Sequence, residues 1–270
     1  MIDFSCIDFS KFSLFDVIIS ITSIIRGKDF CSDFVIMDLK SKIKEANFYI
    51  SSETSDKKRF KKLLNLFYSS WGFGSSDGVY KLSDSLWIDK VLKSKKGTAI
   101  SLAIILFHIS KELNLPLSIV LFPTQLILRA DWSKGDKSFI NPFDGGFLNN
   151  HILEVWLKGN ISPTAELYDH NLKSADLLTI VKKILNTFKT ALMEEKKMDL
   201  ALIANKILLK ITPNDPYEIR DRGLIYSQLD CNHIALADLI YFIENCPEDP
   251  ISEIIKIQIH SIEQKKVIFH

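Results

Sequence analysis

Three polar side chains occupy positions at which an enzyme could keep its reacting groups. Ser101 lies near the start of an apolar helix predicted over residues 98–113, where backbone N–H groups and the helix dipole favour a developing negative charge. Gln125 stands at the head of one predicted strand, and Asn141 directly follows another. A serine at a helix start is a sensible nucleophile if a neighbouring strand supplies a base and a further group orients that base.

The chemistry of these residues argues against a working triad. Neither Gln125 nor Asn141 can take a proton from a serine, and general base catalysis contributes about 10²- to 10⁴-fold to a rate. We therefore predict a hydrogen-bonded polar trio of Ser101, Gln125 and Asn141. Two interpretations stay open: Ser101 is a helix-start residue or a nucleophile, and the amides are structural partners or remnants of a ligand pocket.

An enzyme of altered chemistry would need a base from elsewhere in the chain. His108 follows Ser101 by two helical turns, roughly 10 Å along the same helix, so it cannot accept the serine proton without a bend. Asp144 is the other candidate base. The segment Asp144-Gly-Gly146 is interpreted first as a turn in which the glycines supply positive φ, and second as a phosphate cradle.

Helices and a small sheet are predicted around these residues. Three patterns with apolar residues at steps of three and four lie over residues 13–26, 32–50 and 55–71. After the helix that carries Ser101, short apolar runs of strand length lie over residues 117–122, 125–130 and 138–140. This order predicts an α+β core in which the helix packs on one face of a small antiparallel sheet.

The last third of the chain is predicted to be all-α and to contain a repeat. Pro213-Asn-Asp-Pro216 returns 34 residues later as Pro247-Glu-Asp-Pro250. The small, aromatic, small, large and Pro positions of a tetratricopeptide repeat fall on Gly223, Tyr226, Ala235, Phe242 and Pro247. The preceding window fits less well, because Lys189 stands where Gly223 does. We predict one good repeat, one degenerate repeat and a final helix over 251–266.

The good repeat also supplies a candidate interaction surface. Arg220, Asp221, Arg222 and Tyr226 could line a groove for a protein or peptide, since stacked repeats form concave surfaces. Ion pairing on the helix surface is the alternative assignment for the charged members of this set.

Composition limits the classes of partner and cofactor. Thirty-four basic residues oppose 33 acidic ones, and only five are Arg, so neither nucleic acid nor an anionic membrane is an expected partner. The apolar run over residues 12–25 is too short to span a bilayer. Without a nucleotide-binding glycine pattern or a metal-ligand spacing, no cofactor or metal is expected. Cys6, Cys31, Cys231 and Cys246 form no CxxC pair, which favours a reducing cytoplasm.

Several stretches together resemble bacterial proteins of the SirB/YchA type, in which a transglutaminase-like domain precedes tetratricopeptide-like repeats. They are Gly97-Thr-Ala-Ile-Ser-Leu-Ala103, Phe122-Pro-Thr-Gln-Leu-Ile-Leu-Arg129, Ile140-Asn-Pro-Phe-Asp-Gly-Gly146 and Asp215-Pro-Tyr-Glu-Ile-Arg-Asp-Arg-Gly223. Active members of the wider superfamily resemble papain-type enzymes, with Cys on a helix and His and Asp on the next two strands. The resemblance puts Ser101, Gln125 and Asn141 at these positions, so all three catalytic residue types are replaced.

This resemblance implies an organisation and a function. A transglutaminase-like domain with N-terminal helices is expected over residues 1–170, and a tetratricopeptide-like helical region over 171–270. The protein is expected to be a catalytically degenerate, cytoplasmic interaction or scaffold module with a protein or peptide partner. The alternatives are a serine-nucleophile hydrolase or acyltransferase with a recruited base and, against the even charge balance, a nucleic-acid-binding regulator.

Overall fold

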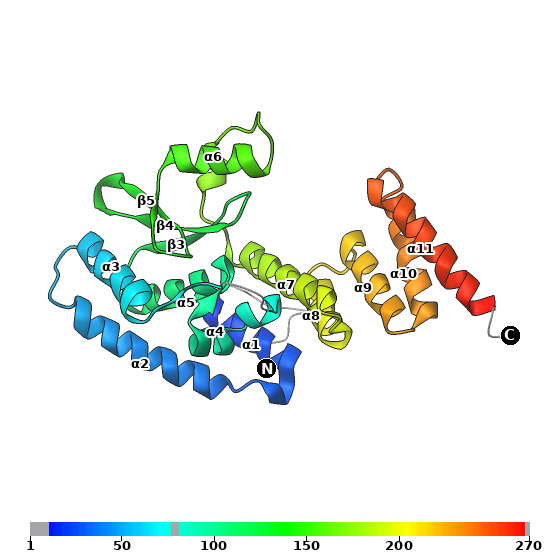
Figure 1. Ribbon diagram of the computed structural model, residues 1–270, viewed down its shortest axis with the longest axis horizontal. Helices are drawn as coiled ribbons and strands as arrows, with labels where there is room; N and C mark the ends of the chain where they lie inside the picture. The colour runs from blue at the N-terminus through cyan, green and yellow to red at the C-terminus, as the bar shows by residue number, and fades with distance from the viewer. Residues whose placement is uncertain (1–10, 77–80, 268–270) are drawn as a thin grey trace. The chain divides into compact units, whose positions relative to one another are not determined.

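Two compact units make up the chain in the computed structural model, which describes residues 11–76 and 81–267 (Figure 1). The first unit holds the described part of Phe9–Ser23 together with Gly27–Val181. The second holds Ile24–Arg26 and the chain from Lys182 onward. The units divide inside helix α7 (Leu177–Glu194), and the domain boundary at residue 170 stays a prediction of the sequence.

Helices form the first part of the first unit. They are α1 (Leu14–Arg26), α2 (Ser32–Ile50), α3 (Asp56–Leu64), α4 (Ile88–Ser94) and α5 (Ala99–Glu112). Local chemistry sets the ends of α1: the Ser13 hydroxyl accepts the backbone N–H of Asp16, and Gly27 ends the helix with a φ of 53°. The helix predicted over 55–71 is present, but it changes type: α3 ends at Leu64 and continues as a π-helical turn over Asn65–Ser70.

A four-stranded antiparallel sheet follows α5. Its strands, in spatial order, are β3 (Leu117–Leu121), β4 (Leu126–Asp131), β5 (Lys137–Ile140) and β6 (Phe147–Leu148). The three predicted strands are present, and β6 adds an edge strand too short to leave an apolar run in the sequence. A separate parallel pair joins β1 (Gly74–Ser75) to β2 (Lys96–Gly97), directly before the helix that carries Ser101.

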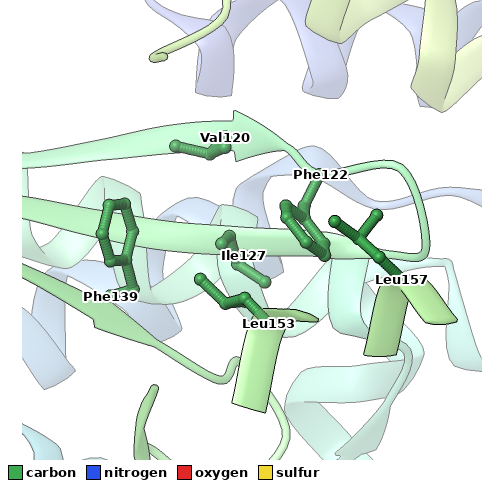
Figure 2. Packing of buried hydrophobic residues seen from close by; sticks show 6 residues of the cluster. All are labelled: Val120, Phe122, Ile127, Phe139, Leu153 and Leu157. Atoms are coloured by element: carbon green, nitrogen blue, oxygen red, sulfur yellow. The ribbon is translucent and has the colours of Figure 1, made fainter. Parts of the chain in front are cut away.

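Both faces of the larger sheet are covered. Helix α6 (Asn150–Asn160) lies over one face, where Figure 2 shows one apolar cluster formed by Val120, Phe122, Ile127, Phe139, Leu153 and Leu157. Successive strand residues point to opposite faces of a sheet. Leu126 and Leu128, the buried residues on either side of Ile127, therefore lie on the other face. Helix α5 packs against β3 and β4, as the predicted α+β core requires.

The rest of the chain is helical and repeats itself as predicted. Its helices are α7 (Leu177–Glu194), α8 (Met198–Ile211), α9 (Pro216–Gln228), α10 (Asn232–Asn245) and α11 (Pro250–Val267). Asp215 accepts the backbone N–H of Tyr217 at 3.0 Å, and 34 residues later Asp249 accepts that of Ile251 at 2.8 Å. Both Asp-Pro steps therefore start a helix by the same capping bond.

Gly223 has the role that its place in the repeat predicts. A Cβ atom added there would lie 3.0 Å from the Asp238 Cβ and 3.0 Å from two atoms of Leu239. A side chain at this position would therefore press on α10, and glycine lets α9 and α10 approach closely without that contact.

Candidate functional site

Ser101 is built into the start of α5 and is not presented to a substrate. Its exposure is 0%, and its Oγ donates a hydrogen bond of 2.6 Å to the carbonyl oxygen of Ser85. The same Oγ accepts the backbone N–H of Thr98 at 3.0 Å, and Thr98 Oγ1 accepts the backbone N–H of Ser101 at 3.3 Å. The two bonds with Thr98 form a reciprocal capping box that satisfies helix-start donors, while the bond to the Ser85 carbonyl occupies the serine proton.

Gly97 provides the space for this hydroxyl. A Cβ atom at Gly97 would lie 2.6 Å from Ser101 Oγ and 3.1 Å from side-chain carbons of Val91 and Leu102. The absence of a side chain at Gly97 thus leaves the space that the Ser101 hydroxyl occupies.

Neither Gln125 nor Asn141 forms a side-chain hydrogen bond with Ser101 in the described part of the chain. Gln125 lies half-buried in the turn between β3 and β4, directly before Leu126, and its amide forms no hydrogen bond with any residue that the structure describes. Asn141 Oδ1 accepts the backbone N–H of Phe143 at 3.2 Å. Within the described ranges no hydrogen bond joins any two of the three side chains, so the predicted hydrogen-bonded trio is wrong. Ser101 instead finds its partners in the backbone around its own helix start.

Asn141 belongs to a tight turn between β5 and β6. Its backbone N–H donates to the Gly146 carbonyl at 2.9 Å, and its carbonyl accepts the N–H of Gly145 at 2.9 Å. Asp144 Oδ1 accepts the N–H of Gly146 at 2.8 Å, which uses the proposed recruited base as a turn-forming group. The segment is therefore a turn, with Gly145 at a φ of 74°.

Tyr68 packs against this turn from the π-helical segment. Its hydroxyl donates to the Pro142 carbonyl at 2.8 Å. Burial, and secondarily the Asp144 carboxylate, raise the pKa of Tyr68, so the phenol stays protonated and keeps this bond. Sequence reasoning missed Tyr68, because a tyrosine within a helical pattern carries no signal for a turn far along the chain.

His108 points into a different part of the unit. Its ring stacks on Phe15 with centroids 4.0 Å apart, and both line a cavity of about 350 Å³ between α1, α2 and α5. Burial lowers the pKa of His108, while Glu112 and Asp16 act in the opposite direction. The helix between Ala99 and Glu112 is a continuous α-helix, so the bend that would bring His108 to Ser101 is absent.

The residues proposed for an interaction surface are tied into ion pairs. Arg222 makes two hydrogen bonds to the Asp238 carboxylate, at 2.7 and 2.8 Å. Arg220 donates to Asp221 at 2.7 and 3.0 Å and lies over the rings of Tyr217 and Phe242. The ion pairing considered as the alternative assignment is thus present.

Tyr226, the remaining member of that set, is half-buried. It packs against the apolar cluster of α10 and α11 that includes Ala235, Leu239 and Phe242. Its ring contributes to helix packing, so the surface needs other residues.

Lys189 is the residue whose role the sequence concealed. It is 2% exposed, and its Nζ lies 2.6 Å from Glu218 Oε2 and 2.6 Å from Asp221 Oδ2. Asn205 donates to the same Glu218 oxygen at 3.0 Å. Burial raises the pKa of Glu218, and attraction to Lys189 opposes that rise. A lysine that looked like a defect of the repeat therefore holds a buried ionic network.

The described ranges contain neither a metal-binding cluster nor a membrane-spanning helix. No group of three or more His, Cys, Asp and Glu side chains there is arranged to hold a metal ion. Cys31, Cys231 and Cys246 are free thiols, and Cys6 lies outside the described residues. No helix in the same ranges is long and apolar enough to cross a membrane.

Comparison with known proteins agrees with the two-part architecture. Residues 34–186 match the model of the transglutaminase-like superfamily, and residues 188–260 match that of the tetratricopeptide repeat. No solved structure matches the chain.

Curated relatives cover nearly the whole chain. A UPF0162 protein of Buchnera aphidicola subsp. Schizaphis graminum is 64% identical over 100% of both chains. Protein SirB1 of Salmonella typhimurium is 51% identical, and UPF0162 protein YchA of Escherichia coli K12 is 49% identical, each over 97% of both chains. The chain therefore belongs to the UPF0162 family of SirB1 and YchA, whose members join a transglutaminase-like region to tetratricopeptide repeats.

Proposed function

We propose that this protein is a catalytically degenerate transglutaminase-like protein that works in the cytoplasm as a protein-interaction or scaffold module. The observation that carries the proposal is the state of Ser101, whose hydroxyl is fully buried and donates to the Ser85 carbonyl. A nucleophile must reach a substrate carbon and pass its proton to a base. This hydroxyl does neither.

The surroundings of Ser101 support the same proposal. Gln125 and Asn141 carry amides, which cannot accept a proton at neutral pH. Of the two bases that an enzyme would have to recruit, His108 is stacked on Phe15 and Asp144 accepts a backbone N–H within its own turn. Neither bonds to Ser101, so neither of these two candidate bases supports the hydrolase or acyltransferase alternative.

The helical unit supplies the binding side of the proposal. Equivalent positions of successive repeats lie 34 residues apart, which pairs Tyr217 with Ile251 and Arg220 with Ile254. Tyr217 is 45% exposed and Ile254 64% exposed. The Tyr217 hydroxyl donates to Asp249 at 2.8 Å and so joins the starts of α9 and α11.

These four positions therefore carry aromatic, cationic and aliphatic groups at repeat-equivalent places on α9 and α11. Single exposed isoleucines are ordinary, but neighbouring ones at repeat-equivalent positions are typical of a binding face. The partner that fits these positions is a protein segment with apolar side chains.

Labelling with a fluorophosphonate probe tests the absence of a nucleophile. We expect the intact mass of the wild-type protein to stay unchanged after hours with excess probe, as that of a Ser101→Ala variant does, because the hydroxyl is buried and has no base. An active serine hydrolase in parallel reactions shows that the probe is competent. Stoichiometric mass addition in the wild type that disappears in Ser101→Ala would establish the enzyme alternative.

Partner capture tests the interaction surface. Ile254 is 64% exposed, and we expect Ile254→Asp to lower the recovery of a protein that the wild-type bait captures from native cytosol at least tenfold. Ile234→Asp on α10, at a position 44% exposed, is the matched control and should retain the partner. Equal recovery by both variants would refute this surface while leaving the non-catalytic proposal untouched.

A further inference from the structure

A second concave site lies on the α6 side of the four-stranded sheet. It is a cavity of about 390 Å³, lined by side chains from β4, β5, the start of α6 and the segment before α7. This volume falls in the range of about 300–1,000 Å³ typical of small-molecule sites. We call it the cationic cavity, after the three basic residues that line it, Arg129, Lys137 and Lys173.

The charges around the cationic cavity are unbalanced. Three lining side chains are positive, and Asp169 is the one acid among the lining residues. Lys137 and Lys173 make no ion pair within the described part of the chain. Since the protein as a whole carries a formal net charge of only +1, this concentration of positive charge is local.

Arg129 is held in a fixed orientation at the wall of the cavity. Its Nε and Nη2 donate to Asp131 Oδ2 at 3.0 and 2.9 Å, and its Nη1 donates to the Leu172 carbonyl at 3.0 Å. A guanidinium has five N–H donors, so these three bonds leave two available. A planar donor that is already oriented loses little freedom on binding an oxyanion.

Two further features complete the cavity. Asn150 is the first residue of α6, after the Asn149 cap. The partial positive charge at this helix N-terminus therefore adds to the charge of the three basic side chains. Phe139 and Leu172 contribute apolar lining beside the charges, and Phe139 is 9% exposed. The site thus offers a charged end and an apolar wall in one enclosure.

We infer that the cationic cavity binds a phosphate monoester whose organic part lies against Phe139 and Leu172. A phosphate monoester carries close to two negative charges at neutral pH and three strong acceptor oxygens. When Asp169 and the Asp131 carboxylate that bonds to Arg129 are both counted, the cavity keeps a formal surplus of one positive charge, which favours an anion. Arg129 and the two lysines supply the charge-assisted donors that such a group requires.

Calorimetric titration at low ionic strength tests the site with defined probes. We expect phenyl phosphate to bind more tightly than inorganic phosphate, because only the ester also covers Phe139 and Leu172, and benzoate to bind weakest. Lys137→Met and Lys173→Met should each weaken phenyl phosphate binding about five- to tenfold. Asp169→Asn should strengthen phenyl phosphate binding about threefold, and misfolding of the variant could not produce such a gain. Each affinity should fall as salt is added.

Lys158→Met is the matched control, since Lys158 lies in the last turn of the same α6 and outside the lining. It should bind phenyl phosphate as the wild type does. If inorganic phosphate bound as tightly as phenyl phosphate, the cavity would be a site for the free anion, and the phosphate monoester proposal would be overturned. Absence of saturable binding at millimolar probe, or weaker binding by Asp169→Asn, would overturn the site itself.

Discussion

Replacing Lys189 by methionine is expected to lower the free energy of unfolding by about 3–5 kcal/mol, because removal of one partner leaves buried charge without compensation. Methionine fills much of the same volume, so cavity formation contributes little to this loss. Glu218 is 6% exposed and would keep Asn205 as a donor, but it would lose its ammonium partner. Urea unfolding followed by far-UV circular dichroism measures the change.

The pH dependence of this variant has a definite sign. Burial raises the pKa of Glu218. A raised carboxyl pKa contributes stability that is fully present below the unfolded pKa, about 4.3, and is lost as pH rises through the folded pKa. Without Lys189 the pKa rises further, with Asp221 and Asp215 acting in the same direction. Lys189→Met should therefore lose less stability at pH 5 than at pH 8.

Two further variants isolate the buried charge. Lys189→Met combined with Glu218→Gln should recover at least half of the lost stability and lose its pH dependence, since the amide can still accept from Asn205. Lys183→Met, at an exposed position of the same helix α7, should change stability by less than about 0.5 kcal/mol. A double variant as unstable as the single one would show that the uncompensated Glu218 charge is not the source of the effect.

Elements with strong local patterns could be predicted from the sequence. Ser13 and Gly27 frame α1, and the 34-residue return of the Asp-Pro step marks the starts of α9 and α11. The π-helical turn after Leu64 could not be predicted, because over so few turns its apolar residues also fit the period of an α-helix. Strands of two residues, such as β6, leave no periodicity at all.

The candidate site was predictable in position but not in its bonds. Local spacing puts Ser101 at a helix start, and the structure agrees. Its strongest partner is the Ser85 carbonyl, a backbone atom 16 residues earlier that has no sequence signature. The same limit applies to Lys189, whose partner Glu218 is 29 residues away. A repeat template compares residue types at equivalent positions and therefore registers a buried lysine only as a mismatch.

Gly145→Ala is expected to destabilise the first unit by about 2–5 kcal/mol, through two costs that add. An alanine at the observed φ of 74° adopts the left-handed region at a cost of about 1–2 kcal/mol. Its Cβ atom would also lie 2.5 Å from the Tyr68 ring, and relief of such overpacking costs about 1–3 kcal/mol. Tyr68 cannot withdraw freely, since its hydroxyl bonds to the Pro142 carbonyl.

Gly135→Ala separates the two costs, because Gly135 has a similar φ of 79° and nothing within 4 Å of the added Cβ. It should therefore lose only the backbone part, about 1–2 kcal/mol. Urea unfolding followed by tryptophan fluorescence compares the two variants, since Trp71, Trp87, Trp132 and Trp156 all lie in the first unit. Equal losses in both would show that Tyr68 yields without cost. A larger loss of unfolding free energy in Gly145→Ala would show that packing of Tyr68 against Gly145 fixes the conformation of the Asn141 turn.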